Sequence, residues 1–381
     1  MNAAYDWVLA MCRYWIAARM GDAADFAPLA PLTVADWDTA ETLGHAHSLE
    51  PIFFSLADSR HDQDDVPDHL RARWEKSYYS NRIQNAEALD MLSRVVEQCR
   101  AGGVSILALK GPAAMADVYQ DIGLRVMADL DILCRPSDLL TVTRAARALG
   151  FRGGDPYLHN VALQYRDHEG GALEVHFTMH YLVKNPRAFL DGVWAEQLTV
   201  SVEEWTCPVM SIEHQLVFDV AHCAHHDFDI ALKHVLDFAG RLRLHRHTLR
   251  WPMLTALLAA SGLTEWFWLL VRTFERMLRL PLVDDVGPLI SADTLRAFER
   301  AFLDRSSTYG LVTRRIAGTG LLRQHGVAAR LAYARSRLFP PAIAIQAAFD
   351  LNSPMQAMLR TPLFAGKTLV NIALRRHQEH H

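Results

Sequence analysis

The chain has little cysteine and no excess of basic residues, and each of these deficits excludes a class of protein. Only five of its 381 residues are cysteine, and they are widely separated with no CxxC spacing. A disulfide framework or a zinc ribbon is therefore excluded, and a reducing cytoplasmic location is favoured. The formal net charge is −4, from 39 Lys+Arg and 43 Asp+Glu. Since no chain-wide basic field exists to attract phosphates, long nucleic acid is not an expected partner.

The sequence also lacks a long and pure hydrophobic run. Charged residues (Asp6, Arg13 and Arg19) interrupt the N-terminal segment, so it has no signal-peptide core. The most apolar stretch, Leu254 to Val271, contains Glu265 and predicts a buried helix. No segment has the length and purity that crossing a bilayer requires, so we expect no membrane span.

The period of the hydrophobic residues changes twice along the chain. Apolar residues recur at helical spacing up to about residue 102, and again from about residue 211. Between these regions, short apolar runs of strand type alternate with short helical segments. The pattern predicts an α+β fold, with a small mixed sheet of four or five strands flanked by N-terminal and C-terminal helical regions. The predicted domains are residues 1–102, 103–210 and 211–381.

Two carboxylates share one face of a predicted strand in the middle region. The segment VMADLDILC covers residues 126–134, and alternate side chains of a strand point the same way. Asp129 and Asp131 therefore point together, while Leu130 and Ile132 point into a core. Because two adjacent carboxylates repel each other, the pair favours a bound cation, and hard oxygen ligands suit Mg²⁺ or Mn²⁺.

A third acid lies on a later predicted strand. In ALEVHF, residues 172–177, Glu174 and His176 point to the face opposite the apolar side chains. This segment and Val161–Arg166 predict an antiparallel hairpin through the turn at Glu169–Gly171. Glu174 completes a three-carboxylate site if its strand lies beside the Asp129 strand. The same pattern also fits the solvent face of a half-exposed sheet, so the acids alone do not decide between the two interpretations.

A possible phosphate-binding turn precedes the acid pair. The apolar run that ends at Leu109 leads directly into Lys110, Gly111 and Pro112, which open a helix. Proline is favoured in the first turn of a helix, and a glycine there lets backbone N–H groups approach a phosphate. Lys110 adds a positive charge for the same phosphates. The turn, the Asp-x-Asp strand and the later glutamate together form a more specific pattern than any one of them.

These segments resemble a known family. The run LALKGPAAMADVYQDIGLRVMADLDILCRPSD, followed by GALEVHF, is similar to the uncharacterised nucleotidyltransferases of the DNA polymerase β-like superfamily. The resemblance covers most of the chain and is looser in the C-terminal helices. Its matching positions are Leu109, Lys110, Gly111, Tyr119, Arg125, Asp129, Asp131, Glu174 and His176. One departure is that the superfamily's Gly-Ser or Gly-Gly turn is Gly111-Pro112 here, so no hydroxyl is available to hold a phosphate.

The resemblance implies a metal-dependent nucleotidyltransferase that uses Mg²⁺ or Mn²⁺. It would move a nucleoside monophosphate from an NTP such as ATP to a hydroxyl of an unknown small-molecule or protein acceptor. The implied metal ligands and catalytic residues are Asp129, Asp131 and Glu174. The implied phosphate-binding residues are Lys110, Gly111 and Arg125. Residues implied to contact the acceptor or to support these groups are His176, Lys233 and Asp237.

Two other functions stay open at this point. His222 and His226 lie four residues apart on a predicted helix, a spacing at which two histidines can hold one Zn²⁺. In addition, His226-Asp227 resembles the dipeptide of HD-type metal phosphohydrolases. A catalytically inactive nucleotide-binding or toxin–antitoxin module would also conserve the overall pattern of strands and helices. Neither the nucleotide base nor the acceptor has a signature in the sequence.

Overall fold

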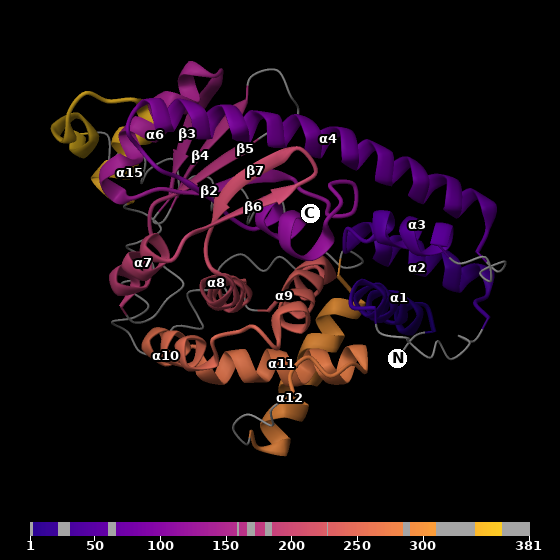
Figure 1. Ribbon diagram of the computed structural model, residues 1–381. Helices are drawn as coiled ribbons and strands as arrows, with labels where there is room; N and C mark the ends of the chain where they lie inside the picture. The colour runs from indigo at the N-terminus through magenta and orange to yellow at the C-terminus, as the bar shows by residue number, and fades with distance from the viewer. Residues whose placement is uncertain are drawn as a thin grey trace, which may run out of the picture. The chain divides into compact units, whose positions relative to one another are not determined.

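The computed structural model contains both helices and strands (Figure 1). It divides into two compact units, and each is built from separate stretches of the chain. Unit 1 comprises Met1–Asp90, Lys110–Met127 and Tyr181–Val312, and unit 2 comprises Met91–Leu109, Ala128–His180 and Thr313–His381. The residues that the structure describes are 3–21, 31–59, 66–157, 160–165, 172–179, 185–226, 228–284, 290–309 and 340–359.

Unit 1 is mainly helical. The long helix α4 (Asp68–Ala101) begins in this unit and continues into unit 2. The other elements of unit 1 are α1 (Ala3–Arg19), α2 (Val34–Ala46), α3 (Glu50–Ser59), α5 (Gly111–Ala114), the π-helical turn η1 (Met115–Tyr119), α7 (Pro186–Ala195), β6 (Leu198–Val202), β7 (Trp205–Val209), α8 (Ile212–His225), α9 (Leu232–His245), α10 (Trp251–Ser261), α11 (Thr264–Leu278) and α12 (Ala292–Ser307). Strands β6 and β7 form an antiparallel hairpin, and α9 packs against η1, α1, α8 and α11.

Unit 2 contains a mixed sheet with its own helices. Its elements are β1 (Leu107–Ala108), β2 (Asp129–Leu133), the 3₁₀ turn η2 (Pro136–Asp138), α6 (Leu139–Ala148), β3 (Phe151–Pro156), β4 (Asn160–Tyr165), β5 (Ala172–His176) and α15 (Ala342–Phe349). The strands of this unit lie in the order β3-β4-β5-β2-β1. β2 and β5 are parallel, whereas the other neighbouring pairs are antiparallel. Helices α6 and α15 pack against this sheet.

The central strands of unit 2 have one apolar face and one polar face. Leu130 and Ile132 of β2 are buried, and they pair with Leu173 and Val175 of β5. β4 continues the apolar face with its buried valine and leucine. The alternate positions carry the polar residues, as the period of two in the sequence predicts. The hydrophobic face thereby determines which way the carboxylates point.

The structure confirms the predicted α+β fold class. In the described residues every strand lies between Leu107 and Val209, inside the window expected from the sequence, and helical regions flank it. β4 and β5 pair antiparallel as predicted, although the turn at residues 169–171 lies outside the described residues. The expected number of strands, four or five, is wrong: the described residues contain seven, and β3, β6 and β7 were not specified from the sequence. The proposed division into domains 1–102, 103–210 and 211–381 stays a prediction.

The prediction of one buried helix through Leu254–Val271 is wrong. Gly262 adopts a left-handed conformation with φ of 71° and ends α10, so a separate helix, α11, follows from Thr264. Among the described residues no single helix is long and apolar enough to cross a membrane; α10 and α11 pass that test only as a pair, bent by 119°.

An aromatic cluster joins the first four helices of unit 1. Trp7 of α1 contacts Trp37, Phe53 and Trp74, with ring centroids 5.1, 5.1 and 6.0 Å away. Trp74 is 1% exposed, so truncation leaves a cavity that the neighbouring rings cannot fill. Large aromatic side chains in such positions dominate the energetics of a core.

Trp74→Ala is therefore expected to destabilise the protein by about 3–5 kcal/mol, since both apolar burial and cavity terms are lost. Urea unfolding followed by tryptophan fluorescence measures this change. The control is Tyr79→Ala on the same helix, where the side chain is 52% exposed, and it should change stability far less. Equal losses in the two variants would show that the cluster does not stabilise unit 1 as described.

Candidate active site

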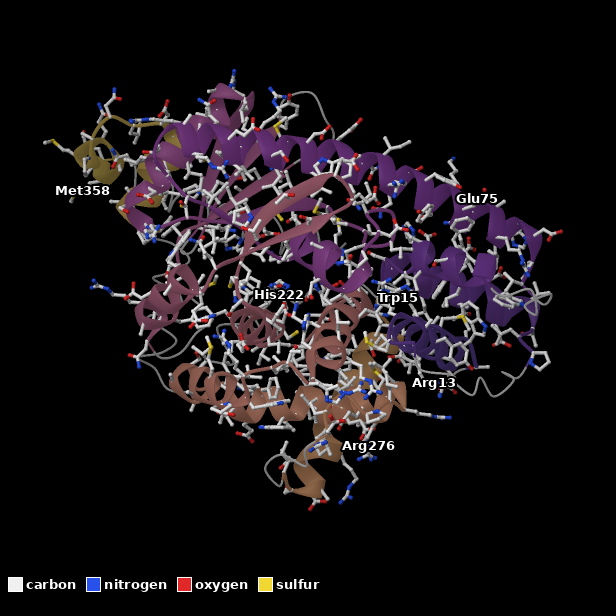
Figure 2. The ribbon with its side chains drawn as sticks, viewed as in Figure 1. Arg13, Trp15, Glu75, His222, Arg276 and Met358 are labelled. Atoms are coloured by element: carbon white, nitrogen blue, oxygen red, sulfur yellow. The ribbon has the colours of Figure 1, made fainter. Side chains whose placement is uncertain are left out.

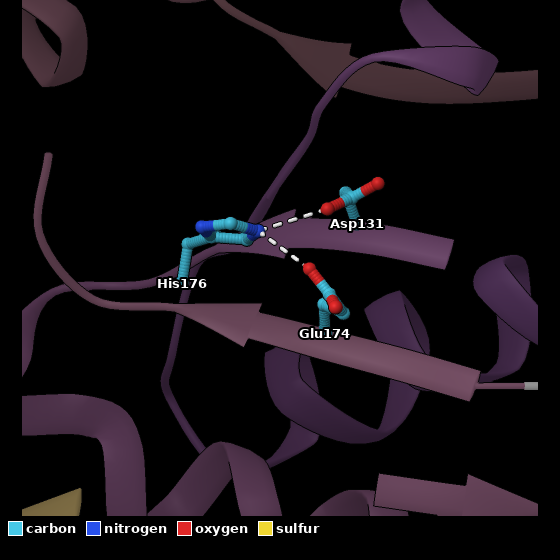
Figure 3. Close-up of side chains that lie close together, drawn as sticks. All are labelled: Asp131, Glu174 and His176. Carbon is cyan, nitrogen blue, oxygen red and sulfur yellow. Dashed lines mark hydrogen bonds and ion pairs between the residues drawn. The ribbon is translucent and has the colours of Figure 1, made fainter. Parts of the chain in front are cut away.

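Two neighbouring strands of unit 2 bring Asp131, Glu174 and His176 together (Figure 3). The parallel register of β2 and β5 pairs Asp131 with Glu174. One ligand atom from each of the three residues lies within 4.8 Å of the others. His176 Nε2 is 2.8 Å from Asp131 Oδ1 and 3.5 Å from Glu174 Oε2, so the imidazole lies between the two carboxylates.

The three side chains differ in their access to solvent. The side chains of Asp131 and His176 are 2% and 1% exposed, whereas that of Glu174 is 26% exposed. Asn160, the β4 residue that pairs with His176, donates from Nδ2 to Glu174 Oε2 over 2.9 Å. A buried carboxylate is costly without hydrogen bonds, and His176 supplies one to Asp131 when its Nε2 carries the proton. Glu174 is thus held by Asn160 and is the most solvent-accessible of the three side chains.

Asp129 lies on the same strand face but outside this group of three. It pairs with Ala172, two positions before the Asp131–Glu174 pair, and its side chain is half-buried. Alternation along β2 aims both aspartates to one side. The structure therefore brings together two of the three predicted acids, with His176 as the third member. Participation of Asp129 in metal binding stays a prediction.

The Lys110–Gly111 turn in unit 1 has an unusual backbone conformation. Lys110 has φ of 49° and ψ of −110°, and Gly111 and Pro112 begin α5 directly after it. A residue with a side chain rarely adopts such a positive φ, and strain of this kind persists only where the surrounding structure enforces it. A Cβ on Gly111 would lie 2.7 Å from Met127 Sδ, so glycine permits this close packing.

The segment before β2 is held by side chains from α4 and α9, all within unit 1. Asn85 donates to the carbonyl oxygens of Ile122 and Arg125. Asn81 donates to the carbonyl oxygen of Gly123 over 2.7 Å. From α9, Lys233 Nζ donates to the carbonyl oxygen of Val126 over 3.3 Å. These bonds satisfy backbone acceptors that no strand or helix satisfies, and they fix the segment that leads into Asp129.

Arg125 and Asp237 form a buried ion pair in this segment. The guanidinium donates from Nη2 to Asp237 Oδ2 over 2.6 Å and from Nε to Oδ1 over 2.9 Å. The Tyr119 hydroxyl also donates to Asp237 Oδ1 over 2.9 Å. Arg125 is 3% exposed. These contacts give Arg125 a role in positioning the segment, and its predicted binding of phosphate is untested.

The helical histidines proposed for an HD-like hydrolase lie in unit 1. His222 and His226 are on α8 and at its C-cap, but Asp227 lies outside the described residues. Within the described ranges, Asp131, Glu174 and His176 are the one group of at least three potential ligands whose donor atoms converge for a metal. No observation in these ranges favours the hydrolase.

The sequence indicated Glu174 and His176 on one face but did not identify Asn160 as their neighbour. The alternation of the two strands contained the signal for Asn160. When β4 and β5 pair with their apolar residues on one face, the even-numbered residues of β4 lie on the opposite face, beside Glu174. The partnership of His176 with Asp131 had no local signal, because it depends on the parallel contact between β2 and β5, and the two residues are 45 positions apart in the chain.

The donor set fits a divalent cation. Two carboxylates from adjacent strands offer hard oxygen ligands, and that of Glu174 is partly exposed to solvent. Mg²⁺ and Mn²⁺ are typically bound by one or two carboxylates together with substrate phosphates. His176 already contacts Asp131, so within this set of ligands it orients the Asp131 carboxylate.

The chain is similar to a known family of proteins. A family described as uncharacterised nucleotidyltransferase matches residues 33–279. None of the curated proteins compared with the chain matches it. Two solved structures are similar at low identity: the antibiotic-resistance factor ANT(2'')-Ia, at 12% identity and a TM-score of 0.36, covers 47% of this chain and 92% of its own. A nucleotidyltransferase-like protein from Paracoccidioides brasiliensis has 14% sequence identity and a TM-score of 0.31. That match covers 48% of this chain and 93% of the other.

The Arg125–Asp237 pair predicts a specific dependence of stability on pH. Burial alone would raise the pKa of Asp237, but the charge of Arg125 and hydrogen bonds from His234 and Arg125 hold that pKa well below its ordinary 3.8. A lowered native pKa means that the pair stabilises the folded protein above about pH 4, and that this contribution is lost as the pH falls further. Asp237→Asn should cost about 3–5 kcal/mol at pH 7, because it leaves a buried guanidinium without its counter-charge.

Urea unfolding at pH 7, 5 and 3 measures the effect. The difference between wild type and Asp237→Asn should shrink at pH 3, because below the ordinary pKa of 3.8 the unfolded wild-type chain takes up a proton on Asp237 that the folded chain does not. Asp293→Asn is the control, since that carboxylate is 93% exposed and should leave the whole profile unchanged. A difference that is constant across the three pH values would contradict the ion-pair account.

Proposed function

The chain belongs to the family of uncharacterised nucleotidyltransferases, and on that basis we propose that it transfers a nucleoside monophosphate from an NTP to a hydroxyl of an acceptor. The acceptor is a small molecule or a protein. The proposal includes dependence on Mg²⁺ or Mn²⁺. The observation that supports it best is the convergence of Asp131 and Glu174 with His176 between them.

A purely structural role explains this arrangement less well. Two carboxylates on adjacent strands repel each other when both are ionised, and Asp131 is almost completely buried. A protein that needed only stability would gain more from apolar side chains at these positions. Retention of both acids, with a histidine and an asparagine that orient them, is typical of a site that binds a cation. The same argument disfavours a catalytically inactive module.

In the proposed reaction Glu174 faces the acceptor, since it is the more exposed of the two acids. It accepts the proton of the acceptor hydroxyl as that oxygen forms a bond to the α-phosphorus. The bond between the α-phosphorus and the bridging oxygen of the β-phosphate breaks, and pyrophosphate leaves with the electron pair. Asn160 holds Glu174 by its hydrogen bond, so the carboxylate does not have to reorient during the transfer.

A divalent cation held by Asp129, Asp131 and Glu174 would neutralise the triphosphate and stabilise charge on the attacking and leaving oxygens. His176 keeps the Asp131 carboxylate in one orientation through the 2.8 Å hydrogen bond. Such fixation lowers the entropic cost of binding the ion. The residue therefore acts through Asp131 and does not touch substrate.

Lys110 and Gly111 are the proposed phosphate-binding residues. Lys110 directly follows Leu109, whose backbone N–H donates to the carbonyl oxygen of Asp131 over 2.9 Å, so the turn is covalently attached to the acid-bearing sheet. Backbone N–H groups at the start of a helix attract phosphate oxygens, and the lysine adds a full charge.

All five cysteines are buried and free of disulfides, which fits the cytoplasm as the proposed location.

Asp131→Asn should reduce nucleotidyl transfer by about a thousandfold or more, because it removes charge that a catalytic cation requires. The assay incubates the protein with each labelled NTP, Mg²⁺ and cell extract, and follows labelled acceptor by mass. The control is Asp155→Asn, which changes an exposed acid on β3 of the same sheet and should retain full activity.

Thermal melting of the same variants separates catalysis from folding. If Asp131 serves a cation, its replacement should leave the melting temperature of the metal-free protein almost unchanged, and Mg²⁺ with NTP should stabilise only the wild type. Early melting of Asp131→Asn without metal, together with no ligand shift in the wild type, would rule out the proposed enzyme and favour a structural acid.

His176→Gln tests the orienting role separately. Glutamine can place a donor near the position of Nε2 but holds it less rigidly, so we expect the half-saturating Mg²⁺ concentration to rise about 10- to 100-fold. The rate at saturating Mg²⁺ should fall much less. A loss of rate that no concentration of Mg²⁺ restores would show that His176 takes part in the transfer itself.

A further inference from the structure

Unit 2 exposes a group of apolar side chains on a short helical turn at residues 354–359, which we call the apolar turn. Met355, Met358 and Leu359 are 71%, 67% and 72% exposed, and Met358 is labelled in Figure 2. Among the described residues, the two other large apolar side chains with comparable exposure lie singly on α2 and on α4. Single exposed apolar residues are common, whereas a contiguous group of them marks an interaction site.

The packing of the apolar turn determines which of its side chains face outward. Ala357 is fully buried in a small core cluster with Ile345 of α15 and Leu351. In a helix with 3.6 residues per turn, the residues one and two positions after Ala357 and two positions before it lie on the opposite side. These are the two methionines and the leucine. The turn is therefore anchored by its one buried side chain and presents the large apolar ones to solvent.

Arginine side chains gather where α15 ends and the chain leads into the apolar turn. Arg147 of α6 donates from Nη2 to the carbonyl oxygen of Ala348 over 2.8 Å. Arg144, on the same helix, is 53% exposed and forms an ion pair with Asp350, with 3.3 Å between Nε and Oδ1. The exposed Arg152 of β3 donates from Nη1 to the carbonyl oxygen of Arg147 over 2.8 Å. The surface of unit 2 before the turn is thus rich in arginine.

The sequence after the apolar turn is also basic. Residues 360–378 lie outside the described part of the structure, and they include Arg360, Lys367, Arg375 and Arg376 but no aspartate or glutamate. The chain as a whole has a net charge of −4, so this composition is opposite in sign to that of the molecule. A local excess of basic residues in an acidic chain indicates an anionic partner.

A lipid surface with anionic headgroups suits both the apolar and the basic residues. Aliphatic side chains gain free energy when they enter the boundary between headgroups and acyl chains, and neighbouring arginines and lysines attract the headgroups. Nucleic acid would use the positive charge, but exposed methionine and leucine gain nothing from phosphates. A second copy of the chain would bring like charges together, which opposes association.

We propose that the apolar turn, together with the arginines before it and the basic residues after it, docks the protein on a membrane surface that contains anionic lipid. Met355, Met358 and Leu359 enter the headgroup boundary, and the basic side chains bind the headgroups around them. Both contributions are required, because one weak contribution gives only marginal binding to a membrane. The inference concerns where the protein binds and does not depend on the proposed transferase chemistry.

Sedimentation of the whole chain with lipid vesicles tests the proposal. The wild type should sediment with vesicles of phosphatidylcholine and phosphatidylglycerol in equal parts, and should stay in solution with phosphatidylcholine alone. The double variant Met355→Gln, Met358→Gln should lower the partition coefficient about tenfold or more, since apolar area no longer leaves water. Arg375→Gln with Arg376→Gln should lower it about tenfold, and added salt should weaken binding of the wild type.

The matched controls are Ile83→Gln, which replaces an apolar side chain of α4 that is 62% exposed, and Arg296→Gln, which replaces an arginine that is 58% exposed. Both should partition like the wild type, and thermal melting should show every variant folded because all the changed positions in the described residues are exposed. Absence of binding to anionic vesicles, or binding that the methionine and arginine variants leave unchanged, would overturn the inference. So would dimers that the methionine variant dissociates, or binding of RNA in place of vesicles.

Discussion

The parallel pairing of β2 with β5 is the constraint on which the candidate site depends. It places Asp131 beside Glu174 and lets His176 reach both carboxylates. A slip of one residue would turn Glu174 into the apolar face and bring Val175 to the site. The register is determined by the buried residues of the opposite face, because each would have to leave the core if the strands shifted. Hydrophobic burial thus fixes the geometry of the polar site.

Local periodicity was sufficient to predict much of this sheet. The alternation in DLDIL and ALEVH gave the faces of Asp131 and Glu174 correctly, because strand geometry alone determines them. β3 was not recognised, since Gly153 and Gly154 suggest a turn. In the structure the register of the strand shifts between Arg152 and Asp155, as glycine-containing strands often do at a bulge.

Contacts between distant parts of the chain could not be predicted in this way. Asn85 holds backbone carbonyls about 40 residues away, and Asp237 binds Arg125 over 112 residues. Asn85 lies on the amphipathic helix α4, and no local pattern distinguishes it from a surface asparagine. The helical histidines have the same character: the spacing of His222 and His226 was visible in the sequence, but the approach of His234 depends on the packing of α8 against α9. The sequence and the family resemblance therefore named the acids and some of the residues near them, such as His176 and Asp237, but not the contacts that these residues make.

The proposed cation site lies on the sheet of unit 2, where β2 and β5 place Asp131 beside Glu174. A crystal structure with Mn²⁺ and a non-hydrolysable NTP analogue tests this assignment most directly. We predict an anomalous scattering peak coordinated by Asp131 and Glu174, with a phosphate oxygen of the analogue completing its coordination. An ion coordinated by His222 and His226 instead, or an analogue bound with no ion at Asp131, would contradict the account.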